Sequence, residues 1–378
     1  LRDSIGPFST NVDIWGQRID ASGPLWGSQG KGLILEPGEQ GDPLLISDQN
    51  GGFIFSFEDG GDFQSGRSKG YWMQRCNGQG NPVWNAGGKL VHQVSQVFSA
   101  SVDLSLTSDG QQGGVLIWNE QPFSITEGNN IYGHRMDAAG NRHWPADLDT
   151  LAGIIFERGY PICTAPGHQA SPIAKSDVLG NIYLCWNDER DPNGQFGALF
   201  AQKVSIDGTY QWDSLGVQVS AGELGGNNQF DMLPDGLGQV YFNYRSSTDD
   251  RVLVKLDSLG DEMWQTPAFI ADNDAIMFSP MKLTSAHGVA IAWLATAINQ
   301  NQQNGIEAQL FDSLGQAQVT GNILLSSYPE DKGPVHIDVG PQEELFAAWM
   351  DWRRTNGQSG SNADADLFAQ KWMPAIVG

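Results

Sequence analysis

The sequence predicts an all-β fold, a β-propeller of four-stranded antiparallel sheets that takes residues 1–378 as a single domain. Three observations predict it. A strand-like segment recurs seven times, a glycine turn follows six of the copies, and a tryptophan follows five of them. Because one small sheet cannot bury its own apolar faces, repeated sheets of this kind pack against one another into a continuous core.

The recurring segment has glutamine at its centre in most copies. Ile14–Asp20, Tyr71–Asn77, Ile131–Asp137 and Leu199–Ser205 align with one another, and residues 251–257, 306–312 and 367–373 follow the same pattern. The central positions are Gln17, Gln74, His134, Gln202, Val254, Gln309 and Gln370, separated by 57, 60, 68, 52, 55 and 61 residues. A period of this size, without helical periodicity, is typical of a propeller and excludes a helical solenoid.

A glycine and then a tryptophan come after the segment, in a D-x-x-G type turn. The glycines are Gly23, Gly80, Gly140, Gly208, Gly260 and Gly315, and the tryptophans are Trp26, Trp84, Trp144, Trp212 and Trp264, with Val319 in the sixth copy. Glycine tolerates the positive φ of a tight hairpin. We expect each tryptophan to pack between neighbouring sheets rather than to bind a ligand.

Each later copy is preceded by an apolar strand that ends on an aromatic residue, as in Phe53–Phe57 and Ile182–Trp186. A shorter apolar segment precedes that strand, so one unit has four strands, here called A, B, C and D, with the glutamine segment at C. We predict seven such blades, the first lacking most of A and B and the last lacking a clear D. Six blades with an overlapping closing strand is the alternative.

Composition excludes several classes of protein. Lys plus Arg total 21 and Asp plus Glu total 44, a formal charge of −23 that repels nucleic acid and anionic membranes. No apolar run is long enough to span a bilayer, so we expect no direct membrane insertion. The three cysteines, Cys76, Cys163 and Cys185, form no zinc motif. We expect buried free thiols, with a Cys163 to Cys185 disulfide as the alternative.

The motifs together resemble a family of bacterial secreted β-propeller repeat proteins. Its units read approximately W-x-D-x-R, then D-I-Y-A-Q-R, then D-x-x-G-x-x-x-W, then a segment like G-V-x-I-C-T-A. Close matches are Trp186–Arg190, Leu199–Lys203 and Pro161–Ala165. The resemblance covers nearly the whole chain, although Val254 and Val319 depart from the pattern. It implies a secreted or cell-surface protein, exported by the type IX route of Bacteroidetes-like bacteria, and it implies no common enzymatic activity.

Loops after the B strands are the most variable, so we predict that the B to C face binds a protein or glycan partner. Trp352 and Arg353 are the candidate ligand-binding residues there. Alternating oxygen ligands make calcium the one candidate cofactor. Its candidate ligands are Glu189, Asp191, Asn193, Asp364 and Asp366. Asp188 with Arg190, and Asp351 with Arg353, are predicted to form structural carboxylate–guanidinium pairs.

No nucleophile motif, metal-binding histidine spacing or phosphate-binding loop occurs, so no catalytic residue is predicted. The sequence therefore favours a non-catalytic extracellular module that binds protein or glycan, as part of a cell-surface assembly. The alternative is a glycoside-cleaving propeller, in which carboxylates distant along the chain converge to about 5 to 10 Å.

Overall fold

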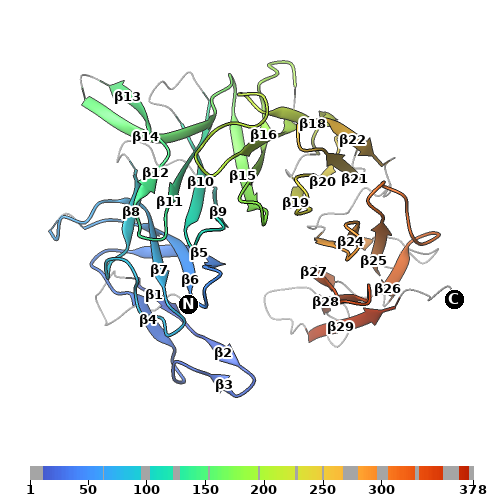
Figure 1. The fold of residues 1–378 in the computed structure, drawn as a ribbon, viewed down its shortest axis with the longest axis horizontal. Helices are drawn as coiled ribbons and strands as arrows, with labels where there is room; N and C mark the ends of the chain where they lie inside the picture. The colour runs from blue at the N-terminus through green and yellow to red at the C-terminus, as the bar shows by residue number, and fades with distance from the viewer. Residues whose placement is uncertain are drawn as a thin grey trace. The chain divides into compact units, whose positions relative to one another are not determined.

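The structure is a computed structural model, and the residues that it describes contain strands and turns but no helix (Figure 1). The described residues are 12–62, 64–94, 103–121, 128–151, 154–194, 196–225, 229–248, 251–266, 280–295, 305–327, 332–351 and 366–373. The predicted all-β class is confirmed, and the repeated antiparallel sheets identify the fold as a β-propeller. None of the described segments is a helix that could cross a bilayer.

Consecutive strands pair in the predicted A-B-C-D order. The second unit is the sheet of β5 (Gln40–Ser47), β6 (Phe53–Asp59), β7 (Gly70–Cys76) and β8 (Lys89–Gln93). The fourth comprises β15 (Gln169–Ser176), β16 (Ile182–Asp188), β17 (Ala198–Val204) and β18 (Val217–Glu223). The fifth comprises β19 (Phe230–Pro234), β20 (Val240–Arg245), β21 (Arg251–Leu256) and β22 (Glu262–Gln265), and the sixth β23 (Met281–Leu283), β24 (Val289–Ala295), β25 (Gly305–Phe311) and β26 (Ile323–Ser326).

The third unit is larger than predicted. Its strands β9 (Leu104–Ser108), β10 (Gly114–Glu120) and β11 (Asn130–Met136) pair in order, and β11 also pairs with β12 (Arg142–His143) and with the long strand β14 (Ile154–Cys163). A further strand, β13 (Asp147–Leu151), forms a hairpin with β14. This insertion accounts for the longest spacing in the repeat, the 68 residues that separate His134 from Gln202.

The first and last units have fewer strands among the described residues, as the sequence predicts. In the first, β1 (Ile14–Gly16) pairs with β4 (Lys31–Ile34), and β2 (Ile19–Asp20) pairs with β3 (Gly23–Pro24). In the last, β27 (Lys332–Val339), β28 (Leu345–Asp351) and β29 (Asp366–Trp372) form a three-stranded sheet. The chain divides into two compact units, residues 1–192 with 201–217, and residues 193–200 with 218–378.

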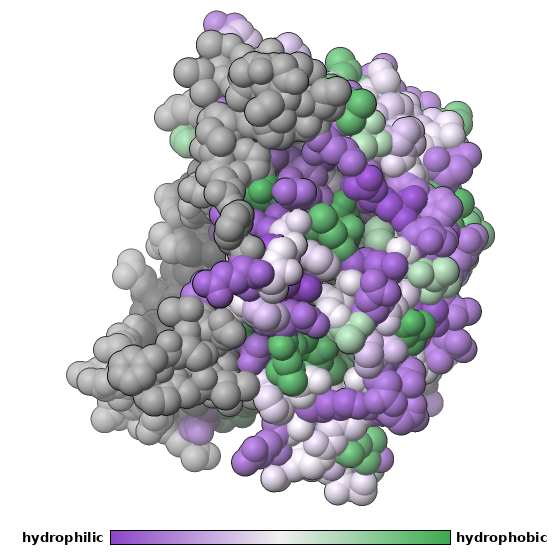
Figure 2. Space-filling view, turned by 90° about the vertical axis from the view of Figure 1, so that its left-hand side faces the viewer, coloured by the Kyte–Doolittle hydropathy of each residue, from purple (hydrophilic) through white to green (hydrophobic). Residues whose placement is uncertain are grey.

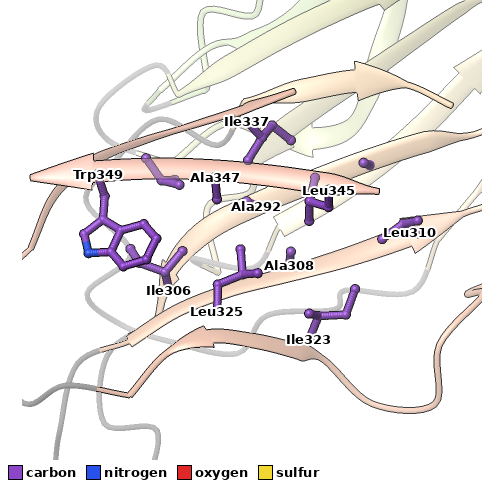
Figure 3. Close-up of a cluster of buried hydrophobic side chains, with 12 residues drawn as sticks. Ala292, Ile306, Ala308, Leu310, Ile323, Leu325, Ile337, Leu345, Ala347 and Trp349 are labelled. Carbon is purple, nitrogen blue, oxygen red and sulfur yellow. The ribbon is translucent and has the colours of Figure 1, made fainter. Parts of the chain in front are cut away.

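The B strands β10, β16 and β20 are almost completely buried, and other strands pair with both of their edges. In the first compact unit, a core between the sheets β5–β8 and β9–β14 includes Ile54, Met73, Leu116 and Trp118. In the second, Figure 3 shows Leu345, Ala347 and Trp349 of β28 directed toward the side chains of β25 and β26. On the surface in Figure 2 polar residues predominate, with apolar ones scattered among them.

The repeated tryptophan docks on the following unit, as predicted. The indole Nε1 of Trp84 donates to the carbonyl oxygen of Ala138 at 3.0 Å, and Trp144 and Trp264 make the same bond, also at 3.0 Å. The ring lies over the turn glycine of that unit. A Cβ on Gly140, whose φ is +79°, would lie 3.0 Å from the Trp84 ring. Glycine is therefore required both for the turn and for the space that the indole occupies.

The side chain of the repeated glutamine forms hydrogen bonds across the C to D hairpin. Gln74 and Gln202 donate from Nε2 to a carbonyl oxygen of the hairpin, and Gln309 does so to Gly321 at 2.7 Å. In each of the three, Oε1 accepts the backbone N–H of the next residue. His134 stands at this position in the third unit, and neither of its ring nitrogens makes a hydrogen bond there.

The cysteines are free and buried, which rules out the alternative disulfide. Burial raises the pKa of the Cys163 thiol to about 12 and that of Cys76 to about 11. Both remain protonated thiols at neutral pH.

Candidate functional site

A carboxylate two residues after the aromatic end of the B strand recurs in several units, and in most of them it is structural. The indole Nε1 of Trp186 donates to Asp188 Oδ2 at 2.8 Å, and Arg190 binds both carboxylate oxygens at 2.8 and 2.6 Å. The Asp188 side chain is fully buried. The predicted Asp188–Arg190 pair is therefore confirmed as a closed bidentate contact.

Two other units show part of this arrangement. Arg67 donates from Nε to Asp59 Oδ2 at 2.6 Å and lies over the Trp72 ring at 4.0 Å. Trp349 donates from Nε1 to Asp351 at 3.2 Å. Arg353, the predicted partner of Asp351, lies outside the described residues.

In the third unit this position is occupied by a glutamate with different partners. Trp118 Nε1 donates to Glu120 Oε2 at 3.3 Å, but no arginine follows two residues later in the sequence. Instead, His92 Nε2 lies 3.0 Å from Oε2 and Arg158 Nη1 lies 3.9 Å from Oε1. The imidazole is not aligned as in a hydrogen bond. The Glu120 side chain remains 20% exposed, so this residue is partly accessible.

Strand register brings a second carboxyl group to the same interface. Glu58 on β6 lies opposite Tyr71 on β7, and Tyr71 lies opposite His92 on β8. Directly paired residues project from the same face of a sheet. Ile54 and Tyr71, on the same face as Glu58, pack against Trp118 in one core, so this row faces the third unit. We call Glu58, Tyr71, His92, Trp118 and Glu120 the Glu120 cluster.

The environment of the cluster affects its groups differently. Burial raises the pKa of Glu58, and the charge of Asp42 raises it further, while Lys69 opposes the shift. The pKa of Tyr71 is raised by burial first and then by the charges of Glu120 and Glu58. Tyr71 is therefore a neutral phenol under the influence of both carboxyl groups. A raised pKa of a partly buried carboxyl group is common in acid–base sites.

Two imidazoles flank Trp118 at this interface. The His92 ring stacks on the indole at a centroid distance of 4.9 Å, and the His134 ring lies at 5.8 Å in a tilted orientation. Burial, reinforced by the charges of Arg142 and His92, lowers the pKa of His134 to about 3. His134 is therefore neutral at pH 7, and its Nε2 lies 3.6 Å from Glu157 Oε1.

The residues predicted from the sequence as binding sites lie elsewhere. Trp352, Arg353 and Asp364 are outside the described residues. Asp366 begins β29, and the other candidate ligands are exposed in the loop after β16, namely Glu189, Asp191 and Asn193. In the described part of the chain, no three His, Cys, Asp or Glu side chains are placed to hold a metal ion. Calcium binding at these positions stays a prediction.

Sequence reasoning missed the Glu120 cluster, although one signal was present. Trp118-Asn-Glu120 is a variant of the W-x-D motif, with a longer acid and without the arginine that normally follows. Such a departure indicates a carboxylate that lacks the arginine with which this motif usually pairs it. Glu58, Tyr71 and His92 carried no comparable signal, because only the strand register brings them together.

No protein-family model and no curated protein matches the chain, so the resemblance to secreted repeat proteins stays a prediction. Solved structures do match. They include a protein of unknown function from Dyadobacter fermentans, at 12% identity over 89% of this chain and 95% of that one, with a TM-score of 0.39. An ulvan lyase, described as a new family of polysaccharide lyase, matches at 9% identity over 85% and 78%, with a TM-score of 0.48. A sialidase from Streptococcus pneumoniae matches at 10% identity over 97% and 71%, with a TM-score of 0.41.

The prediction of a non-catalytic binding module is contradicted by this comparison. The ulvan lyase, the sialidase and further neighbours described as arabinofuranosidases are carbohydrate-active enzymes, which agrees with the alternative of a glycoside-cleaving propeller. At identities of 9 to 13% the likeness concerns the fold.

Proposed function

We propose that this protein hydrolyses glycosidic bonds of an extracellular polysaccharide, with Glu58 as general acid and Glu120 as general base. One observation carries the proposal. Two partly accessible glutamates from different units lie on either side of the buried Tyr71–His92 pair, at the B to C side of their sheets. Glycoside hydrolysis by the common two-carboxyl route requires such a pair.

The two glutamates differ in the way that this route needs. Glu58 has a raised pKa, so it retains its proton at a higher pH than an ordinary glutamate and is suited to protonate the leaving oxygen. Glu120 is oriented by the Trp118 indole N–H, and His92 and Arg158 lie beside its two oxygens. An oriented carboxylate of this kind is suited to accept a proton from water.

We assign inversion at the anomeric carbon, because the two glutamates come from strands that do not neighbour one another. Neighbouring strands lie about 4.8 Å apart, so the backbones at Glu58 and His92, two strands apart, are separated by roughly 10 Å. Glu120 lies beside His92 on the other sheet. In an inverting enzyme, a water molecule lies between the base and the bound sugar. Water then adds to the anomeric carbon as the glycosidic bond breaks; its proton passes to Glu120, and the proton of Glu58 passes to the departing oxygen.

Tyr71 and His92 are assigned positioning rather than reacting roles. Both are buried, with exposed fractions of 4% and 2%, whereas the two glutamates are partly accessible. Tyr71 lies between Glu58 and His92 in the strand register, and His92 stacks on Trp118 beside Glu120.

The proposal is tested by incubating the full chain with arabinoxylan, ulvan and a sialylated glycan and measuring new reducing ends. We expect at least one polymer to be cleaved. Glu58→Gln and Glu120→Gln should each reduce the rate by roughly 10²- to 10⁴-fold, because each removes one proton-transfer group. Glu262→Gln, at an exposed position on β22, is the matched control and should retain full activity.

Two further readouts decide the mechanism. Nuclear magnetic resonance of the first product should show an inverted anomeric configuration. The rate should fall on the alkaline side as Glu58 loses its proton, at a pH above the ordinary glutamate range. Unsaturated uronate ends in the product, or full activity of both glutamine variants, would overturn the proposal.

A further inference from the structure

The first repeat contains a cavity of about 430 Å³ beside β1, separate from the Glu120 cluster. It lies between the first repeat and the sheet β5–β8, and its walls are mainly apolar. Its lining includes four aromatic residues and one cation, namely Trp15, Trp26, Phe53, Phe55 and Arg18. A concave, mainly apolar site with a few polar groups is the usual form of a small-ligand pocket.

Trp26 at this cavity departs from the docking contact of the other repeats. Trp84, Trp144 and Trp264 donate their indole N–H to a carbonyl oxygen of the next turn. The equivalent carbonyl for Trp26 is that of Gly78, and Arg18 Nη1 donates to it instead, at 2.8 Å. The indole N–H of Trp26 therefore has no acceptor among the described residues, although its ring still packs over Gly80.

A second indole donor at the cavity is also unpaired. Trp15 Nε1 is inaccessible to bulk solvent and has no hydrogen-bond partner in the described structure. A buried donor without an acceptor costs about 1 to 3 kcal/mol, so such groups in native proteins call for an explanation. An acceptor oxygen from a bound molecule would satisfy the indole N–H of Trp26, whose ring is partly exposed.

The other wall is an aromatic surface. Phe53 and Phe55 stack along β6 with ring centroids 6.0 Å apart, and the Phe53 ring lies 5.9 Å from that of Trp26. Aromatic faces suit the C–H faces of a sugar ring, while the indole N–H groups suit its oxygens. The chemistry of the walls thus matches a molecule that is apolar on its faces and rich in acceptors at its rim.

Arg18 gives the cavity a positive charge within a chain of net charge −23. Its Nη1 bonds Gly78, and its remaining N–H groups have no acceptor among the described residues. The nearby carboxylate of Asp20 accepts instead from the backbone and hydroxyl of Ser22, at 2.7 and 2.5 Å. A planar guanidinium binds a carboxylate or sulfate well.

We infer that this cavity binds one acidic sugar unit of a polysaccharide, with the ring against Phe53 and Trp26 and its anionic group on Arg18. The inference rests on the proposed function for the class of ligand, and it adds a subsite outside the reacting groups. The anionic group has two sources, a uronate carboxylate or a sulfate ester, which share the same recognition by Arg18.

The test is calorimetric titration of the full-length Glu120→Gln variant, which is not expected to consume its ligand. The probes are oligogalacturonate, a sulfated carrageenan oligosaccharide and neutral xylohexaose. We expect one of the acidic probes to bind at least tenfold more tightly than xylohexaose, and the better of the two identifies the anionic group. Arg18→Gln should weaken that binding about tenfold or more, since a charged hydrogen bond is lost.

Lys282→Gln, which removes an exposed cation in the second compact unit, is the matched control and should bind normally. Arg18→Lys should recover part of the affinity that Arg18→Gln loses. Such a recovery would show that the loss comes from the missing charge and not from misfolding. Equal binding of acidic and neutral probes, no binding of any probe, or normal binding by Arg18→Gln would overturn the inference. Arg18-dependent binding without any cleavage by the unmodified chain would refute the proposed function and leave this site standing.

Discussion

Trp186, Asp188 and Arg190 form a contact that we call the Asp188 clamp. It occupies the same place in its unit as the Glu120 cluster does in the preceding one, but only the Asp188 clamp is closed. Asp188 is fully buried and is held by an indole N–H and a bidentate guanidinium. Glu120 keeps the indole contact at a longer distance, 3.3 against 2.8 Å, and is 20% exposed. The cation beside it, Arg158, is 3.9 Å away rather than in direct contact.

The residue contributed by the preceding unit differs as well. Cys163 Sγ lies 3.8 Å from Asp188, whereas His92 Nε2 lies 3.0 Å from Glu120. An inert thiol is thus replaced by an imidazole, and a clamped carboxylate by an accessible one. Under the proposed function, a structural position of the repeat acquires chemistry through local changes of this kind, without any change of fold.

The largest expected effect concerns the closed clamp. Asp188→Asn should lower the free energy of unfolding by about 3 kcal/mol, because it leaves the Arg190 guanidinium without its carboxylate. Glu120→Gln should lower it by about 1 kcal/mol or less, since that carboxylate is partly exposed and loosely held. Urea denaturation of both variants measures the difference. Equal losses of unfolding free energy in the two variants would contradict the distinction between a structural clamp and a functional site.

A second prediction concerns the neutral imidazole behind the Glu120 cluster. The pKa of His134 is lowered to about 3 in the folded state from an ordinary value near 6.5, so the unfolded chain binds a proton that the folded chain does not. This contribution to stability is complete above pH 6.5 and is lost as the pH falls toward 3. At pH 5 the loss should be about 2 kcal/mol.

His134→Gln is the natural control, because glutamine occupies the equivalent position in five other units, at Gln17, Gln74, Gln202, Gln309 and Gln370. The variant should lose less stability than the unmodified chain between pH 7 and pH 5. Chemical denaturation at the two pH values provides the measurement. An identical pH dependence in both proteins would show that His134 is not the group responsible.

The smallest effect is expected at the thiol of the closed clamp. Cys163 is buried and its pKa is raised to about 12, so a thiol reagent at pH 8 should modify it slowly in the folded protein. Asp188→Asn should speed the reaction several-fold by loosening the contact. Mass spectrometry of the labelled peptide follows the rate. Fast labelling of the unmodified protein would mean that this clamp is no more closed than the Glu120 cluster.

The scaffold was predictable because its signals are local. The glycine and the tryptophan that follow each C strand lie within a few residues of it, and the W-x-D-x-R motif places Asp188 and Arg190 in one turn. The Glu120 cluster was not predictable in this way. Its carboxyl groups come from two units, and a bulge between Tyr71 and Trp72 sets the register of His92. The raised pKa of Glu58 follows from burial that no local pattern encodes.

The bond from each indole to the next turn also bears on how such a chain can change its length. Each of Trp84, Trp144 and Trp264 belongs to one unit, while the carbonyl and glycine that receive it belong to the following one. A gene segment encoding one whole period therefore carries both a docking tryptophan and a turn that receives the tryptophan of the preceding unit. In-frame gain or loss of that segment leaves every junction with a matching pair, so evolution can add or delete blades without inventing a new contact.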